Sequence, residues 1–350
     1  MIHYATYCDH RYLPRALVLL QSLREHSPPF TLWCLALSPE CATALERLDA
    51  AEVRVVPLES LELADKPLLA TKKSRTKAEY FFTLTSCWCE YLLGGHPEID
   101  LLTYLDSDLC FYSSPQPLFD ELGSASIGII EHRSMKPWRV ENKYGRFNVG
   151  WLSFRNDAAG RSCLRRWREQ CLDWCHDRIE PTRYADQKYL DEWPSLYASL
   201  RIFGNPGVNL APWNVAGHRL GIGPAGITVD DQPLVFFHFA NVKPLPGGIV
   251  DLGLAAYGVS FAKRRWLRDH LYRDYLFQLR AAAAASVPTS DSAAFARTGR
   301  QEGLRAPVYI RVAATVANAT RSLWQPARDA WSLWSGSGVR VEATPAAHRR

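Results

Sequence analysis

Several features that would place the protein in a class at once are missing from the sequence. No long apolar run is present: the longest early one, Ala16 to Leu20, is far too short to span a bilayer. The first residues, Met1 to Tyr4, carry neither the basic region nor the cleavage site of a secretory signal. Internal repeats are also lacking. We therefore expect a globular, cytoplasmic protein.

An excess of positive charge is absent from most of the chain. The 350 residues carry a net charge of +5. Residues 286–350 hold nine arginines and four acidic residues, so this segment accounts for the whole excess and the remainder is neutral. A nucleic-acid-binding domain needs a basic face of its own, which excludes that class for the larger part of the chain.

The nine cysteines lack the paired spacing of a closed metal site. The clusters are Cys87-Trp88-Cys89 and Cys171-x3-Cys175-His176, and no second pair stands at a familiar distance from either. Structural, reduced thiols are favoured, and a zinc site stays the alternative. Reduced thiols are typical of the cytosol.

What is present is an alternation of strand-like and helical segments. The β-α-β-α-β order at the start predicts an α/β protein with a mostly parallel central sheet, right-handed crossovers and flanking helices. Strands are predicted at 2–8, 30–36, 53–56, 99–105, 127–131, 147–155 and 234–239, and helices at 16–26, 39–48, 74–93, 158–178 and 184–193.

A change of composition predicts three parts. Residues 1–280 form the main domain, and residues 281–306 a linker that begins with five alanines. Residues 307–350 form a basic tail rich in Trp and Arg, partly helical and, from Gly336, disordered. A helix of that kind can lie on the inner face of an anionic membrane or pack on the main domain, and both readings stay open.

The strongest chemical signal is a pair of carboxylates after a buried strand. Ile99 to Leu105 is nearly all apolar, as in a central parallel strand, and Asp106-Ser107-Asp108 follows. Ligands gather at the carboxyl ends of such strands. A hard divalent cation binds carboxylates and substrate phosphates and can neutralise a departing diphosphate. Asp-x-Asp alone also occurs in ordinary turns, so its position supplies most of the signal.

Five segments in order over residues 1–245 resemble the GT-A fold glycosyltransferases, specifically the retaining family typified by glycogenin and bacterial lipopolysaccharide galactosyltransferases. The segments are Ala5-Thr6-Tyr7-Cys8-Asp9 with Tyr12-Leu13-Pro14, Tyr104-Leu105-Asp106-Ser107-Asp108, Phe147-Asn148-Val149-Gly150, Ala185-Asp186-Gln187, and Phe236-Phe237-His238-Phe239 with Lys243-Pro244. The family usually has Gly where Ala240-Asn241 stands here and Trp at Leu245, which leaves the phosphate contact of this loop open.

This resemblance implies a GT-A, Rossmann-like fold and transfer of a hexose, with retention, from a nucleotide-diphosphate sugar. A UDP-hexose donor is favoured, and the acceptor is a glycan, a lipid-linked sugar or a polysaccharide. Asp106, Asp108 and His238 would bind Mn²⁺ (or Mg²⁺), and an imidazole beside two carboxylates suits Mn²⁺ better. The remaining implied residues are Thr6, Tyr7, Asp9, Tyr12, Arg75, Lys77, Asp106, Ser107 and Lys243 for the donor, and Asn148, Asp186 and Gln187 for catalysis.

Each of these residues also has a simpler reading. His238 can be a core histidine, Asp9 and Asp186 can be caps, and Arg75 and Lys77 can belong to a solvated helix face. The segment from Asn205 to His218, rich in Asn, Gly and Trp, can line an acceptor pocket or form an ordered surface loop.

Other classes fit the motifs less well. A metal-dependent phosphohydrolase wants a small hydroxyl residue soon after the second Asp, where Leu109-Cys110 stands. A nucleotidyltransferase needs a glycine-rich phosphate loop, and Thr6 to Leu13 contains no Gly. A catalytically inactive nucleotide-sugar-binding protein would not need metal and sugar contacts together.

Overall fold

The computed structural model describes residues 1–135, 141–245, 249–286 and 338–340. The chain divides into two compact units, Met1–Phe239 and Ala240–Arg350. This boundary lies before residue 280, where the sequence predicted the end of the main domain. The predicted metal ligands all lie in the first unit.

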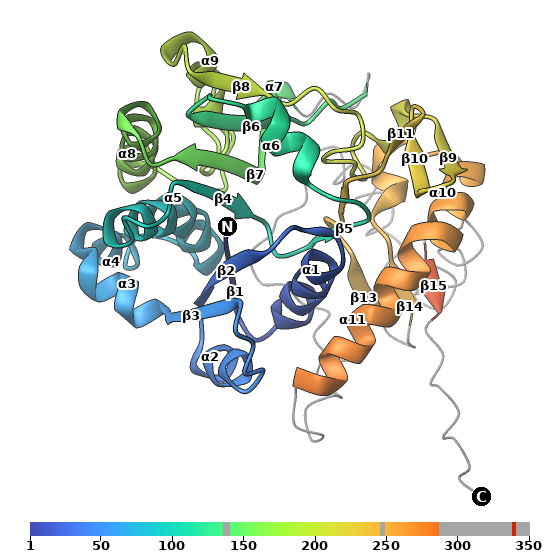
Figure 1. Ribbon diagram of the computed structural model, residues 1–350, viewed down its shortest axis with the longest axis horizontal. Helices are drawn as coiled ribbons and strands as arrows, with labels where there is room; N and C mark the ends of the chain where they lie inside the picture. Colours follow the sequence, from blue (N-terminus) through green and yellow to red (C-terminus); the bar gives the residue numbers. More distant parts are fainter. Residues whose placement is uncertain (136–140, 246–248, 287–337, 341–350) are drawn as a thin grey trace, which may run out of the picture. The chain divides into compact units, whose positions relative to one another are not determined.

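A seven-stranded sheet lies at the centre of the first unit (Figure 1). Its order is β3-β2-β1-β4-β7-β6-β8, and its pairs are parallel except that β7 runs antiparallel to both β4 and β6. Strand β2 is buried at every position, as expected of a strand covered on both faces. The α/β class with a mostly parallel, helix-flanked sheet is confirmed. The strands are β1 Ile2–Cys8, β2 Phe30–Ala36, β3 Val53–Pro57, β4 Leu101–Leu105, β6 Ile127–Glu131, β7 Phe147–Arg155 and β8 Leu200–Ile202.

Helices connect and cover these strands. The helix predicted at 74–93 begins at a capping box, in which the Thr76 side chain and the Glu79 side chain each accept from the other's backbone N–H. The helix predicted at 158–178 ends at Asp173, and the one predicted at 184–193 is a short 3-10 turn followed by α9. The helices are α1 Leu13–His26, α2 Pro39–Glu46, α3 Leu58–Ala64, α4 Lys66–Thr71, α5 Lys77–Gly95, α6 Gln116–Leu122, α7 Glu141–Tyr144, α8 Ala158–Asp173, η1 Lys188–Glu192, α9 Trp193–Leu196 and η2 Val215–Gly217.

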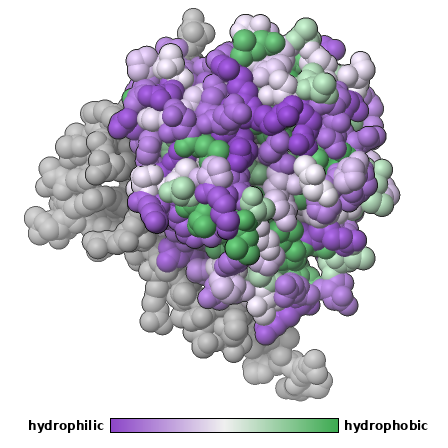
Figure 2. All heavy atoms as spheres, turned by 90° about the vertical axis from the view of Figure 1, so that its left-hand side faces the viewer, coloured by the Kyte–Doolittle hydropathy of each residue, from purple (hydrophilic) through white to green (hydrophobic). Residues whose placement is uncertain are grey.

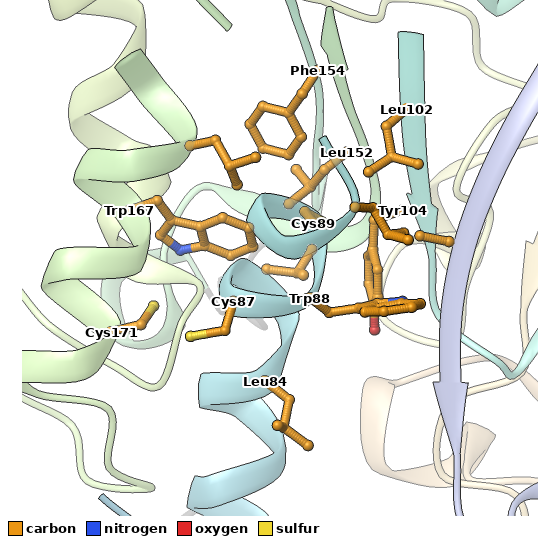
Figure 3. Packing of buried hydrophobic residues seen from close by; sticks show 14 of the residues in the cluster. Leu84, Cys87, Trp88, Cys89, Leu102, Tyr104, Leu152, Phe154, Trp167 and Cys171 are labelled. Atoms are coloured by element: carbon orange, nitrogen blue, oxygen red, sulfur yellow. The ribbon is translucent and has the colours of Figure 1, made fainter. Parts of the chain in front are cut away.

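Helix α5 forms the middle of the largest hydrophobic cluster. Figure 3 shows its buried side chains, among them Trp88, between those of α8 and those of β4 and β7. Trp88 and Trp167 are fully buried, and each removes roughly 150–250 Å² from water. The outer face that carries α3, α4, α5 and α8 is mainly hydrophilic, with small separate hydrophobic groups (Figure 2). This layer therefore holds the sheet from one side and faces solvent on the other.

The strand predicted at 234–239 lies outside the central sheet. It is shorter, β12 Phe236–His238, and pairs antiparallel with β5 Leu109–Phe111. A third small sheet in the first unit is formed by β9 Leu220–Gly223, β10 Gly226–Val229 and β11 Gln232–Pro233. All nine cysteines are buried free thiols.

The second unit contains a three-stranded sheet and a run of helices. Strand β15, Gly338–Arg340, pairs with β14, so this part of the tail is not disordered as the sequence predicted. The other elements are β13 Lys243–Leu245, β14 Ile249–Asp251, η4 Leu254–Tyr257, α10 Phe261–Leu267, η5 Arg268–Tyr272 and α11 Arg273–Ser286. Most of the predicted linker and the predicted Trp/Arg helix fall in 287–337, outside the described residues. Among the helices within the described ranges, none has both the length and the apolar character of a membrane span.

Candidate metal and donor site

Asp106 and Asp108 lie in the turn that leads from the carboxyl end of β4 into β5. The Asp106 N–H donates to the Gly150 carbonyl (3.1 Å), and the Leu109 N–H donates to the Asp106 carbonyl (3.3 Å). Tyr104 donates its hydroxyl to Asp106 Oδ1 (2.9 Å) and orients that carboxylate. The Asp106 and Asp108 side chains are 30% and 16% exposed. The strand thus delivers both carboxylates to the edge of the sheet.

His238, the residue before the C-terminal end of the first unit, lies next to this pair of carboxylates. In the β5–β12 register it lies opposite Leu109, and the ladder continues with the Phe239 N–H donating to the Asp108 carbonyl (3.0 Å). His238 Nε2 lies 3.0 Å from Asp108 Oδ1 and 3.6 Å from Asp106 Oδ2. The short β12 therefore carries the imidazole to both carboxylates.

Aromatic contacts hold β12 and its histidine in place. Phe236 stacks on Trp151 of β7, with ring centroids 5.7 Å apart and planes at 9°. Trp213 meets the His238 ring edge-on at 5.1 Å, and its indole N–H donates to the His132 carbonyl (3.0 Å). The histidine is only 5% exposed.

The three ionisable groups perturb one another. Burial raises the pKa of Asp106 to about 6; the Asp108 charge acts in the same sense, against His238 and Tyr104. Burial also opposes ionisation of Asp108, but the charge and hydrogen bond of His238 outweigh it and lower the pKa. Burial opposes charge on His238 as well, yet the two carboxylates raise its pKa overall. The site therefore favours a positive charge beside its carboxylates.

The oxygen and nitrogen atoms of these three side chains suit a divalent cation. One ligand atom from each of Asp106, Asp108 and His238 lies within 4.8 Å of the other two, the one such group of three His, Cys, Asp or Glu in the described part of the chain. Metal-bound histidines usually donate through the second ring nitrogen, which fixes the ring. His238 Nδ1 is buried without a hydrogen-bond partner, so packing has to orient this ring.

Asn148 and Gln187 form an amide pair next to these ligands. Asn148 Nδ2 donates to Gln187 Oε1 (3.3 Å), and Gln187 Nε2 donates to the Tyr144 carbonyl (2.8 Å). The side-chain oxygen Oδ1 of Asn148 accepts from the Gly150 N–H (3.1 Å). The structure thus brings two of the three predicted catalytic residues into contact.

Asp186, the third, is a buried carboxyl group. It is 5% exposed, and burial raises its pKa to about 7; the charge of Asp106 adds to this, while a hydrogen bond from Thr85 acts against it. The preceding Ala185 has a φ of 45°, in the left-handed region that a residue with a Cβ adopts only under constraint. Trp167 donates its indole N–H to the Asp186 carbonyl (2.7 Å). These contacts hold the carboxyl where its charge is unfavourable.

The residues predicted to bind the base and ribose surround the end of β1. Thr6 is fully buried, and its hydroxyl has no hydrogen-bond partner. Asp9 accepts from the Arg11 and Tyr12 N–H groups (3.0 and 3.1 Å) and from Lys77 Nζ (2.9 Å). Asp9 therefore orders the loop, and its contact with a nucleotide stays a prediction.

Tyr7 faces the site from the same strand. Its hydroxyl lies 3.3 Å from the Thr85 hydroxyl, and its ring lies 5.8 Å from that of Tyr104. Burial raises its pKa strongly, and the charges of Asp186 and Asp106 add to the effect. Tyr7 thus lies within electrostatic range of both carboxylates.

The predicted phosphate contacts have different surroundings. Arg75 donates to the Thr83 hydroxyl and to the Leu172 carbonyl (2.7 Å), and so ties α5 to the end of α8. Lys77 is 62% exposed, and its ammonium group forms an ion pair with the buried Asp9 carboxylate at 2.9 Å. Ser107 is half-buried between the two aspartates, and Lys243 is exposed in β13 of the second unit. For all four residues the phosphate role stays a prediction.

Arg15 was not predicted as a site residue. This residue of α1 is 8% exposed, its guanidinium lies over the Tyr12 ring at 4.5 Å, and its charge helps to lower the pKa of Asp108. Arg15 stands directly before the helix predicted at 16–26, and the structure includes it in α1. Tyr104, which orients Asp106, was predicted only as part of the segment Tyr104–Asp108 and not as a site residue.

The loop predicted to line an acceptor pocket uses one of its amides internally. Asn214 is fully buried, donates to the carbonyls of His132 and Asn209 (both 2.9 Å), and accepts from the Ala211 N–H (2.9 Å). Asn209 has a φ of 54°, and its side-chain oxygen has no hydrogen-bond partner. Asn214 therefore anchors the loop, which keeps Trp213 against His238.

Known proteins resemble the chain to different extents. No protein-family model matches it. The uncharacterised protein YfnF of Bacillus subtilis (strain 168) is 30% identical over 248 residues, which cover 69% of this chain and 81% of YfnF. The uncharacterised protein YfnD of the same organism is 27% identical over 242 residues, which cover 68% and 77%.

Solved structures resemble it more distantly. The galactosyltransferase LgtC in complex with donor and acceptor sugar analogs shows 16% identity and a TM-score of 0.47, covering 83% of this chain and 99% of LgtC. Mouse xyloside xylosyltransferase 1 shows 16% identity and a TM-score of 0.45, covering 70% and 99%. The glycosyltransferase GlyE of Streptococcus pneumoniae TIGR4 shows 15% identity and a TM-score of 0.44, covering 70% and 56%. At these values the function has to follow from the residues of the site.

Proposed function

The chain belongs to the same family as YfnF of Bacillus subtilis, and we propose that it is a glycosyltransferase. The donor is a nucleotide-diphosphate sugar, with a UDP-hexose favoured, and the acceptor is a glycan, a lipid-linked sugar or a polysaccharide. The observation that carries the proposal is the group Asp106, Asp108 and His238 at the carboxyl edge of β4, next to Asp186 and the Asn148–Gln187 pair.

A divalent cation, Mn²⁺ or Mg²⁺, would be held by Asp106, Asp108 and His238. Once bound, it would neutralise the charge that develops on the diphosphate as the sugar leaves. The imidazole nitrogen favours Mn²⁺ over Mg²⁺. The two carboxylates raise the pKa of His238 against the effect of burial, so they stabilise a positive charge at this point, which a bound cation would supply in place of the proton.

The chain's own residues would hold the sugar and the nucleotide. The Asn148 and Gln187 amides can exchange their mutual hydrogen bond for sugar hydroxyls, and buried Asp186 can bind another hydroxyl. Thr6, whose buried hydroxyl has no partner, and Tyr7, Asp9 and Tyr12 would contact the base and ribose. Arg75, Lys77, Ser107 and Lys243 would meet the phosphates. Retention of configuration is part of the proposal.

A location in the cytoplasm, with peripheral contact of the tail at the inner membrane face, completes the proposal. Reduced thiols are typical of that compartment, and all nine cysteines are free. The nine arginines of residues 286–350 would contact anionic lipid, which would bring the enzyme near lipid-linked acceptors.

Calorimetric titration with UDP, GDP, CDP and ADP, each with and without Mn²⁺, tests the donor site. We expect tight binding of one nucleotide, UDP, that requires the metal. Asp108→Asn should abolish metal-dependent binding because one anionic ligand is lost. Asp100→Asn, at the exposed opposite end of the same strand, is the matched control and should bind like the wild type.

The outcomes separate the competing functions. Metal-dependent UDP binding that survives in Asp108→Asn contradicts the ligand assignment. Failure to bind any nucleotide with metal present contradicts the transferase and favours a metal-dependent phosphohydrolase. Binding without turnover of any UDP-hexose, measured as release of UDP, indicates an inactive nucleotide-sugar-binding protein.

A further inference from the structure

The backbone of Gly150 in β7 forms hydrogen bonds to a predicted metal ligand, Asp106, and to a predicted sugar contact, Asn148. Its carbonyl accepts from the Asp106 N–H (3.1 Å), and its N–H donates to Asn148 Oδ1 (3.1 Å). The β6–β7 register shifts at this point, between Ile129 and Ile130, so that Ile130 lies opposite Asn148. The bulge leaves Gly150 without a partner residue in β6, while its carbonyl continues the β4–β7 ladder beyond the Leu105–Trp151 pair and so holds Asp106.

The His238 ring occupies the space that a side chain at position 150 would need. A Cβ there would lie 2.9 Å from His238 Nδ1, 3.0 Å from His238 Cε1 and 2.7 Å from Asn148 Oδ1. The separations from His238 Nδ1 and Asn148 Oδ1 are shorter than Cβ atoms adopt in proteins, so one of these side chains would have to shift. His238 cannot easily move aside, because Trp213 lies against its ring and Phe236 anchors its strand.

The conformation of the backbone does not explain a glycine here. Gly150 is outside the set of residues with positive φ, so an alanine could adopt its backbone without strain. What the position requires is the absence of a Cβ. The same ring has no hydrogen bond at Nδ1 to fix it, so its orientation depends on the atoms packed around it.

We propose that Gly150 is a positioning residue: because it has no Cβ, the side chains of His238 and Asn148 can take the positions in which they bind the metal and the donor sugar, respectively. This inference rests on the proposed function for the identity of the ligands. It adds that the two groups share one steric constraint, so a larger residue at position 150 displaces both.

Gly150→Ala tests the inference through metal binding. We expect Mn²⁺ affinity, measured by calorimetry without nucleotide, to fall roughly 10- to 100-fold, the usual effect of disturbing the surroundings of a ligand. Gly128→Ala is the matched control: it lies on the neighbouring β6, and its Cβ would meet Phe203 at 2.7 Å and Leu122 at 3.1 Å. Unchanged Mn²⁺ affinity in folded Gly150→Ala overturns the inference.

A double-mutant cycle keeps the inference testable where Gly150→Ala folds poorly. Thermal unfolding is measured for the wild type, Gly150→Ala, His238→Ala and the double variant. We expect Gly150→Ala to lower Tm less in the His238→Ala background, because the methyl group then enters the vacated space. Equal losses in both backgrounds overturn the inference. Because no metal is needed, the cycle decides it even if the wild type binds no Mn²⁺, a result that would count against the proposed function alone.

Discussion

Replacing Asp186 by asparagine should stabilise the protein at neutral and alkaline pH. Burial, assisted by the charge of Asp106, raises the pKa of Asp186 from 3.8 to about 7. The folded state therefore binds this proton more tightly than the unfolded state, and stability is lost as the pH rises from about 4 to about 7. Compared with a side chain that does not titrate, Asp186 lowers the free energy of unfolding by about 2 kcal/mol at pH 5, where its carboxyl is protonated in the folded state but ionised in the unfolded state. At pH 8, where it is ionised in both states, the loss is at most about 4 kcal/mol.

Urea unfolding at pH 5 and pH 8 measures this difference. Asp186→Asn should gain free energy of unfolding at both values, and the gain should be larger at pH 8. Asp157→Asn is the control of opposite sign: the Asp157 carboxylate accepts from the Gly160 N–H at the start of α8, and its pKa is lowered because this and other hydrogen bonds outweigh burial. It should lose stability by nearly the same amount at pH 5 and at pH 8, because both values lie above the pKa of this carboxyl group in the folded and the unfolded state. A gain in Asp186→Asn that does not depend on pH would refute the reasoning.

Mn²⁺ provides a second readout on the same variant. A cation held by Asp106 would favour the charge on Asp186, so the stabilisation by asparagine at pH 8 should shrink when Mn²⁺ is saturating. If Mn²⁺ leaves the stabilisation by Asp186→Asn unchanged, the charge at Asp106 does not affect the ionisation of Asp186. A buried carboxyl group whose ionisation lowers the stability of the fold is typical of a functional residue.

Two further predictions concern the metal and the tail. Mn²⁺ affinity should fall below about pH 6, because protons then compete with the metal for its ligands. Burial raises the pKa of Asp106 to about 6, and the two carboxylates raise the pKa of His238 although burial opposes its charge. Calorimetry at pH 5 to 8 measures the affinity, and a constant value would exclude these ligands. Replacing Arg311, Arg321 and Arg328 by Glu should lower cosedimentation with anionic phosphatidylserine vesicles, at about 1 kcal/mol for each basic residue near the surface, while UDP binding stays unchanged. Equal cosedimentation of variant and wild type would leave the tail without a membrane role.

The central strand and its two carboxylates could be predicted because the signal is local. A continuous apolar run identifies β4, and the direction of a parallel strand places Asp106 and Asp108 at the ligand edge. His238 could not be placed in this way. It lies next to Asp108 because its strand pairs with β5, and no residue within 234–239 indicates that β5 is the strand it pairs with. The resemblance supplied this residue where local pattern could not.

Other features of the site depend on packing that the sequence does not record. Asn214 has the residue type of a sugar contact, but its amide bonds to backbone groups of its own loop and of His132. The left-handed backbone at Ala185 carries no signal, because alanine rarely adopts it. The need for glycine at position 150 appears only when the neighbouring imidazole is known. The helices α3 and α4 are too short for a periodic pattern to reveal them.

The order in which the ligands occur along the chain bears on synthesis. Asp106 and Asp108 leave the ribosome well before His238, which lies next to the last residue of the first unit. The strands from β1 to β8 have all emerged by then, so they can associate before the third ligand exists. A cation that needs all three side chains would therefore not serve the nascent chain as a folding nucleus, as zinc does in a small zinc domain. If the proposed site holds an ion, that ion would bind after the strands that carry the two aspartates have been made.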